Sequence, residues 1–187
     1  LNADRVGIFQ FDPESGFNDG EFISEAVLPE FPSALAARVR DHCFGDHYAV
    51  HYASGLIQAV NDTSQAGLSD CHLAILSQFQ IKANLIVPLL QGSDLWGLLC
   101  IHQCSAPRHW QPDEIEFVTH IAEHLAIALQ QAELLSLTRQ QAERQKALSS
   151  VIKKIRASLN LKTIFQATAT EVRQLLNADR VGVFRFY

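Results

Sequence analysis

An internal repeat constrains most strongly what this chain can fold into. Residues 1–11 read LNADRVGIFQF, and residues 176–186 read LNADRVGVFRF. The two copies differ only at Ile8/Val183 and Gln10/Arg185, and both changes are mild. The match is too dense for chance, and the copies lie too far apart for a solenoid repeat. The pattern therefore indicates tandem copies of a whole domain.

The repeat predicts three segments. Residues 1–130 should form a domain that lacks its first helix. Residues 131–158 should form a linker helix that resembles a coiled coil, and residues 159–187 should begin a second, truncated domain. One domain plus an extension is also what a chain of 187 residues allows.

Composition excludes several classes of protein. The chain is 48% hydrophobic and 19% charged, so it can bury a core. Its net charge of −5 leaves no basic footprint for nucleic acid. No apolar run approaches the roughly 18 residues that span a bilayer, and no charged leader precedes an apolar stretch. We therefore expect a cytoplasmic domain without membrane contact in this part of the chain.

Local patterns predict an α+β domain, in which a central antiparallel sheet is flanked by helices and followed by a long C-terminal linker helix. The signals are alternation, turn residues and helical spacing. They predict strands at Arg5–Phe11, Phe22–Leu28, Ile57–Val60, Ala83–Leu90 and Leu95–His102, a loop at Asn61–Leu68, and helices at Ser33–Val39, at His72–Phe79 and from Gln111 onward. Ser33 would cap the first of these helices.

Two cysteines lie in distinctive settings. The first is in Asp41-His42-Cys43-Phe44 and the second is in Asp70-Cys71-His72-Leu73. Carboxylates and imidazoles beside a thiol can move protons and favour its nucleophilic thiolate form. Cys100 and Cys104 are different, because their spacing within an apolar strand pattern is typical of core thiols and lacks a matching zinc-ligand pair.

The chain resembles the GAF family in the predicted hairpin and in the helix that closes the domain, and the resemblance covers most of residues 1–130. The segments that carry this resemblance are Asn84-Leu85-Ile86-Val87-Pro88-Leu89, Leu95-Trp96-Gly97-Leu98-Leu99, Trp110 and Glu114. Within that family, the two cysteine motifs resemble the dual-cysteine cyanobacteriochromes of the Asp-Xaa-Cys-Phe lineage, here in a tandem-GAF sensor. The resemblance implies a photoreceptor of the phytochrome superfamily.

The resemblance also implies a cofactor and roles for the motif residues. The cofactor would be a linear tetrapyrrole, phycocyanobilin or phycoviolobilin. Cys71 would attach it through a thioether, and His72 would hydrogen-bond its pyrroles and lactam carbonyls. Asp41 would bind the pyrrole nitrogens, Phe44 would pack near the chromophore, and the Cys43 thiol would add reversibly to the central methine bridge. That addition would shorten the conjugated system and produce the blue or violet state.

Supporting residues match the family less closely. Tyr52 and Gly55 match a Tyr-Xaa-Xaa-Gly-Arg segment, but Leu56 stands where Arg is usual. A leucine cannot pair with a propionate carboxylate, so a basic residue such as His47, His51 or Lys82 would substitute, or one propionate would face solvent.

His102 matches a family position that faces the distal ring of the pigment. A buried histidine with a purely structural role is an equally good interpretation of this residue, so both stay open.

The apolar stripe of the predicted long helix indicates that this helix pairs with a second copy. From Val118 its apolar residues step through Ala122, Leu125, Leu129 and Ala132, and the stripe resumes at Leu148, Ile152, Ile155 and Leu159. Its first turns suit packing on their own domain, and the rest suits a parallel homodimer that carries a signal.

Other functions compete with the photoreceptor. A GAF domain without pigment could sense a small molecule such as a cyclic nucleotide, or serve only for dimerisation. No phosphate loop or catalytic triad is visible, so we expect no enzyme here beyond attachment of the chromophore. A histidine kinase or another output domain would lie elsewhere in the full-length protein.

Overall fold

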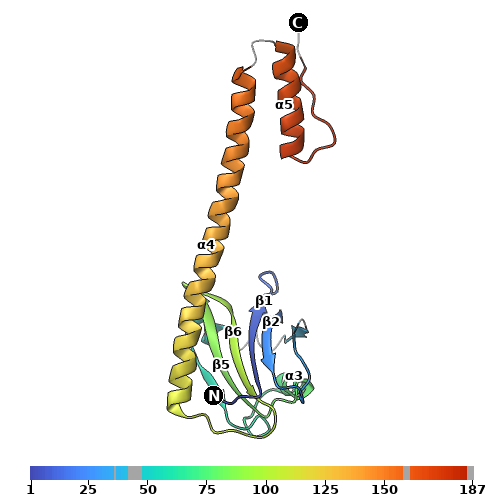
Figure 1. Ribbon diagram of the computed structural model, residues 1–187. Helices are drawn as coiled ribbons and strands as arrows, with labels where there is room; N and C mark the ends of the chain where they lie inside the picture. Colours follow the sequence, from blue (N-terminus) through green and yellow to red (C-terminus); the bar gives the residue numbers. More distant parts are fainter. Residues whose placement is uncertain (36, 42–47, 158–160, 185–187) are drawn as a thin grey trace. The chain divides into compact units, whose positions relative to one another are not determined.

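The computed structural model describes residues 1–35, 37–41, 48–157 and 161–184. In the described residues six strands form one sheet in the order β3-β2-β1-β6-β5-β4, and neighbouring strands pair antiparallel (Figure 1). The elements in chain order are β1 Arg5–Phe11, β2 Asp19–Val27, β3 Arg38–Arg40, α2 Ala49–Ala53, β4 Gln58–Val60, α3 Asp70–Gln78, β5 Ala83–Gln91, β6 Asp94–Gln103, α4 Pro112–Ala157 and α5 Leu161–Leu175. This architecture confirms the predicted α+β fold with a long C-terminal helix.

One face of the sheet packs against the first turns of α4. Alternate residues of each strand point to this side, as the period of two in a strand requires. On β5 these residues are Leu85, Val87 and Leu89, and they share a buried cluster with Val118 and Ala122 of α4. This layer covers the sheet on one side, so that any ligand cavity must lie on the other.

The opposite face carries a second buried cluster. Phe9 and Phe11 of β1 lie there with Ile86 of β5 and Leu98 of β6. Tyr52 of α2 and Leu76 of α3 belong to the same cluster. The short helices therefore cover this face incompletely, and the cavity described below opens between them and the sheet.

The repeated motif has a structural explanation in its first copy. Asn2 has φ 45°, a left-handed conformation that asparagine tolerates better than most residues. The Asp4 carboxylate accepts hydrogen bonds from the backbone N–H groups of Cys104 and Ser105, both at 2.7 Å. Arg5 is fully buried and its Nε lies 2.9 Å from the Glu25 carboxylate. The motif thus ties β1 to β2 and to the end of β6.

One sequence prediction in this domain is wrong. Ser33–Val39 does not form a helix in its described residues, because Leu35 bridges to Phe22 and β3 begins at Arg38. The reason is Glu25, whose carboxylate accepts hydrogen bonds from Ser33 Oγ at 2.5 Å and from the Ala34 N–H at 2.9 Å. These bonds hold the segment against β2, where it continues into a strand.

The start of α4 follows the predicted pattern. Pro112 is its first residue, and the Glu114 carboxylate accepts a hydrogen bond from the Gln111 N–H at 3.0 Å. Arg108 donates to the same carboxylate at 2.5 Å. Among the described residues, no helix is long and apolar enough to cross a membrane.

The chain divides into two compact units, Leu1–Gln130 and Gln131–Tyr187. The second unit contains the later turns of α4 and the helix α5, which lie side by side (Figure 1). Lys154 of α4 and Glu171 of α5 form an ion pair there. Asn177 follows α5 with φ 49°, close to the value at Asn2, so the two copies of the repeat share this conformation.

The predicted stripe of α4 divides into two parts. Val118 and Ala122 are buried against the sheet, and Leu125 and Leu129 pack partly against the same cluster. Leu148 and Ile152 are half exposed instead, at 52% and 49%. The first part of the stripe therefore stabilises its own domain, and only the later part is available for a partner.

Candidate functional site

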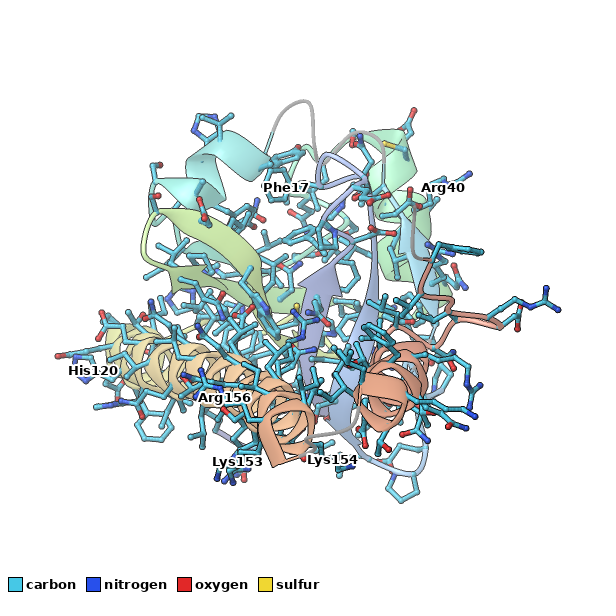
Figure 2. The ribbon with its side chains drawn as sticks, turned by 90° about the horizontal axis from the view of Figure 1, so that it is seen from above. Phe17, Arg40, His120, Lys153, Lys154 and Arg156 are labelled. Atoms are coloured by element: carbon cyan, nitrogen blue, oxygen red, sulfur yellow. The ribbon has the colours of Figure 1, made fainter. Side chains whose placement is uncertain are left out.

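The candidate site is a cavity on the face of the sheet that α4 does not cover. It encloses about 90 Å³, and its lining is mainly aromatic and aliphatic. Phe17 stands near its edge at φ 69° and packs edge-to-face against Phe11. In Figure 2 Phe17 and Arg40 lie on the side of the sheet occupied by α2 and α3, and His120 of α4 lies on the other. Pockets for drug-sized ligands are on the order of 300–1,000 Å³, so the lining must move apart to admit a large ligand.

A polar cluster lies at one end of this cavity. Asp41 follows β3 and His72 lies in the first turns of α3, and both line the cavity. Asp41 Oδ2 lies 2.6 Å from His72 Nδ1, and both side chains are largely buried. The Asp41 backbone N–H donates to the Asn18 carbonyl at 2.8 Å, which fixes the carboxylate beside the helix.

Cys71 lies beside this pair. Its Sγ is 4.0 Å from Asp41 Oδ1 and 3.4 Å from Ser69 Oγ. The fold therefore brings Asp41 of the first cysteine motif next to Cys71 of the second. Its position in the first turn of α3 agrees with the predicted loop-to-helix junction. The Cys71 sulfur is in a disulfide in this structure. Attachment of a pigment at this residue therefore requires that the disulfide is reduced first.

Cys100, unlike Cys71, is part of the cavity lining, and its chemistry is different. It is a free thiol at the centre of β6, and burial raises its pKa to about 12. The thiol therefore stays protonated near neutral pH and is a poor nucleophile. Cys104 is a free, buried thiol as well, so both residues lie in the core as the sequence predicted.

Tyr52 lines the cavity from α2. Its hydroxyl donates a hydrogen bond to Gln58 Oε1 at 2.7 Å, and Gln58 lines the cavity too. Burial raises the Tyr52 pKa, so the hydroxyl remains a donor at any physiological pH. Gly55 has φ 91° with open space around it, and Leu56 beside it is 45% exposed.

The suggested substitutes for the missing arginine fall partly outside this cavity. His51 and Lys82 are exposed and do not line it. His47 lies outside the described residues, as do Cys43 and Phe44, so their predicted roles stay predictions.

His102 lies deep in the cavity and is 3% exposed. Desolvation lowers its pKa to about 3, and the nearby Arg5 guanidinium acts in the same direction. The imidazole is therefore neutral. Its Nδ1 has no hydrogen-bond partner among the described residues, which is unusual for a buried polar atom.

Asn84 is the cavity residue that sequence reasoning missed. It is 1% exposed and lies directly opposite His102 across the β5–β6 ladder. Its Oδ1 also lacks a partner in the described part of the chain. The available signal was an amide directly before a continuous apolar run, residues 85–90.

The fold described above is that of a known protein family. Residues 1–129 match the GAF domain model. The chain belongs to the GAF family. This GAF domain is 41% identical over 136 residues to a putative methyl-accepting chemotaxis protein of Synechocystis sp., a match that covers 73% of this chain and 13% of that protein. The chain therefore spans only about an eighth of that relative.

Solved GAF structures are similar over most of the first unit. The blue-light absorbing form of the Thermosynechococcus elongatus PixJ GAF domain is 35% identical, with a TM-score of 0.68 over 74% of this chain and 81% of that one. The far-red absorbing dark state of JSC1_58120g3, with bound biliverdin, is 29% identical, with a TM-score of 0.63 over 70% and 81%. The solved structures that are similar to this GAF domain include cyanobacteriochromes.

Proposed function

We propose that this GAF domain is a photoreceptor domain of the dual-cysteine lineage, with phycocyanobilin or phycoviolobilin attached at Cys71. The observation that carries the proposal is the pair of Asp41 and His72 in the lining of an apolar cavity, with Cys71 beside Asp41. A pigment of this kind needs a nucleophilic sulfur beside a carboxylate and an apolar, aromatic enclosure. The described residues supply the carboxylate and the apolar, aromatic lining in one cavity, and the Cys71 sulfur, once reduced, would lie beside that carboxylate.

The residues of the site fit a tetrapyrrole chemically. Its pyrrole N–H groups would donate to the Asp41 carboxylate, and its conjugated plane would lie among the phenylalanines of the lining. The unpartnered polar atoms of Asn84 and His102 indicate that the cavity is built for a ligand with polar edges. When bound, the pigment supplies light absorption and 15Z/15E isomerisation.

Each cysteine has a separate task in this proposal. After reduction of the disulfide, the Cys71 thiol would add across the double bond of the side group on the first ring: its sulfur would bond to one carbon, and its proton would end on the neighbouring carbon. In the reduced protein the Asp41 carboxylate, 4.0 Å from the sulfur, could accept the thiol proton and pass it on. The Cys43 thiol would add reversibly to the central methine and so set the blue or violet state.

Signal output would involve the helices beyond the cavity. We propose that α4 pairs in parallel with a second copy through its exposed later turns, and that residues 159–187 begin a second GAF domain. A histidine kinase or chemotaxis transducer further along the chain would receive the signal. In this proposal the GAF domain itself catalyses nothing except attachment of its own chromophore.

Co-expression with enzymes that make phycocyanobilin tests the attachment site. The chain extended to complete both domains should become coloured, and the pigment should survive denaturing electrophoresis. Cys71→Ala should abolish covalent pigment, and Cys100→Ala is the matched control because that thiol lines the cavity but stays protonated. Normal covalent pigment in Cys71→Ala would contradict the assignment. A colourless wild-type protein under reducing conditions would favour a GAF domain that binds another small molecule.

The role of Cys43 has its own test. Serine has a similar size, but its hydroxyl is hardly ionised near neutral pH. Cys43→Ser should keep its pigment on Cys71, lose the blue or violet band and absorb at longer wavelength in both photostates. An unshifted spectrum would show that Cys43 forms no bond to the chromophore.

A further inference from the structure

The turn between β1 and β2 forms part of the wall that separates the cavity from solvent. Phe17 and Asn18 of this turn both line the cavity. Most of the other lining residues that the structure describes are buried, whereas Phe17 is 36% exposed. The Phe17 side chain therefore contacts the cavity and the solvent at once, as a side chain that closes an opening must.

Phe17 has a backbone conformation that a phenylalanine rarely adopts. Gly16 and Phe17 have φ 62° and 69°, and the Asn18 N–H donates to the Ser15 carbonyl at 3.3 Å. Two central residues with positive φ are typical of a type I′ turn, which prefers glycine, asparagine or aspartate at both positions. A bulky residue is strained there. The turn alone would favour glycine at position 17, so the aromatic ring indicates a role at the cavity.

The base of this turn is fixed, while its tip is open. Ser15 Oγ donates to the Asp12 carbonyl at 2.8 Å, which holds the base. At the tip, a Cβ built on Gly16 would have no atom nearer than 3.9 Å. The Phe17 ring packs edge-to-face on Phe11, with centroids 5.3 Å apart. Rotation of the backbone at Gly16 and Phe17 would therefore lift the ring off Phe11 and leave the base of the hairpin intact.

Asn18 adds a hydrogen-bond acceptor to the same wall. Its Nδ2 donates to the Ser15 carbonyl at 3.2 Å, which fixes the orientation of the amide. Its Oδ1 is buried and has no partner among the described residues. The backbone carbonyl of Asn18 accepts the Asp41 N–H at 2.8 Å, so this acceptor belongs to the same end of the cavity as Asp41. A free acceptor near a carboxylate suits a ligand that brings hydrogen-bond donors.

We propose that the β1–β2 turn is the entrance of the cavity, with Phe17 as its gate and Asn18 Oδ1 as an acceptor for the bound ligand. The ligand class is an apolar molecule with N–H donors along its edge, and the inference rests on the proposed function where it takes this ligand to be the tetrapyrrole. The cavity of about 90 Å³ holds no such molecule until its wall opens. Phe17 rotates outward to admit the ligand and returns to Phe11, and Asn18 accepts a hydrogen bond from a ligand N–H.

Labelling of Cys100 in the pigment-free protein tests the gate without any pigment. Cys100 and Cys104 are both free and buried, but only Cys100 belongs to the described lining. Phe17→Gly removes the ring and suits the left-handed backbone. It should raise the rate at which methyl methanethiosulfonate modifies Cys100, relative to Cys104, by about fivefold, the size expected when an aromatic pair is lost. Peptide mass spectrometry measures the two thiols separately.

Two further variants complete the labelling experiment. Phe17→Asn tolerates the same backbone conformation and should act like Phe17→Gly. Phe117→Ala is the matched control, because this exposed phenylalanine lies on α4 and not in the lining, and it should leave the ratio of the two rates unchanged. If the Phe17 variants raise both rates equally, or raise neither, Phe17 contributes only to stability and the gate is wrong.

The affinity for phycocyanobilin tests Asn18. The titrations use Cys71→Ala as the parent protein, so that binding is measured without covalent attachment. Asn18→Leu should raise the dissociation constant about fivefold, the effect of one net hydrogen bond. Asn18→Asp keeps an oxygen acceptor and should bind at least as tightly as the parent. Both variants lose the Nδ2 bond to Ser15, so an effect through the turn alone would weaken both.

Each other outcome of the titration contradicts part of the inference. If Asn18→Asp binds no better than Asn18→Leu, or if Asn18→Leu binds as the parent does, Asn18 accepts no hydrogen bond from the ligand. Either result leaves the photoreceptor function intact. A parent protein that binds no phycocyanobilin would overturn the proposed function and the role of Asn18 together, and the labelling of Cys100 would still decide the gate.

Discussion

Asn84 and His102 are polar residues in a part of the fold that otherwise buries hydrophobic side chains. Both sit in strands whose other inward residues are buried hydrophobic groups, and both leave a polar atom without a partner among the described residues. Asp41 and His72 differ, because they satisfy one another at 2.6 Å. The cavity thus combines a satisfied polar end beside Cys71 with an unsatisfied end deep in the sheet. A ligand with polar groups at several points along an apolar body suits this arrangement.

The buried imidazole of His102 predicts a pH dependence of stability. Its pKa is about 3 in the folded protein and near 6.5 in the unfolded chain. Between these values the unfolded state binds the extra proton, so the folded state loses stability as the pH falls below about 6.5. The slope from this one group approaches about 1.4 kcal/mol per pH unit.

Urea unfolding of the pigment-free protein at a series of pH values checks this effect. His102→Gln cannot titrate, so its stability should fall less steeply than that of the wild type between pH 6.5 and pH 5. Carboxylates such as Glu25 contribute equally to both proteins and cancel in the comparison. Equal slopes would show that His102 takes up a proton in the folded state near its ordinary pKa.

At the scale of elements, β1 is the strand that holds the two halves of the sheet together. It pairs with β2 on one side and with β6 on the other. Gly97 of β6 lies where the backbones approach closely, and a Cβ built there would be 2.3 Å from the Phe9 carbonyl oxygen. Backbone atoms cannot move aside as a flexible side chain can, so glycine is required at this position.

Gly97→Ala should therefore destabilise the domain strongly, by about 3 kcal/mol, the upper end of the usual range for overpacking that displaces backbone. Gly92→Ala is the matched control in the β5–β6 turn, where φ is +65° but nothing lies within 4 Å. That variant should cost only about 1 kcal/mol, from the left-handed conformation. Thermal unfolding of both variants measures the difference. Equal losses would mean that β1 and β6 can separate locally without cost.

At the scale of the whole molecule, α4 serves two purposes along its length. Its first turns complete the core of the GAF domain through Val118 and Ala122. Its later turns belong to the second unit and expose Leu148 and Ile152. Charges at Leu125 or Leu129 would consequently damage the domain core as well as any dimer. The later residues are the better places to test association.

Leu148→Glu combined with Ile152→Glu should raise the dissociation constant of the dimer by at least about tenfold. The reason is that burial of even one leucine-sized side chain contributes a free energy of roughly that size. Ser150→Glu is the control, since it places a charge on the opposite side of the same helical turns. Sedimentation velocity over a concentration series measures the change. An undisturbed dimer in the double variant, or a wild-type monomer, would rule out pairing through these turns.

Much of the domain could be predicted from the sequence because the signals were local. Alternation placed β1, two runs of large apolar residues around a turn placed the β5–β6 hairpin, and proline with acidic residues placed the start of α4. The Asp-Cys-His motif put Cys71 and His72 at the start of a helix, and α3 begins there. These features depend on neighbours within a few residues, which a single sequence displays directly.

Other features were decided by tertiary contacts. Ser33–Val39 has helical residues, but the Glu25 carboxylate from another strand binds Ser33 and Ala34 and prevents the helix. The stripe on α4 predicted that the first turns pack on their own domain, but only the tertiary contacts show that this packing extends to Leu125 and Leu129. The position of Asn84 opposite His102 follows only from the register of the β5–β6 pairing. Contacts between residues distant in the chain carry this information, since burial and hydrogen-bond partners exist only once the strands have paired.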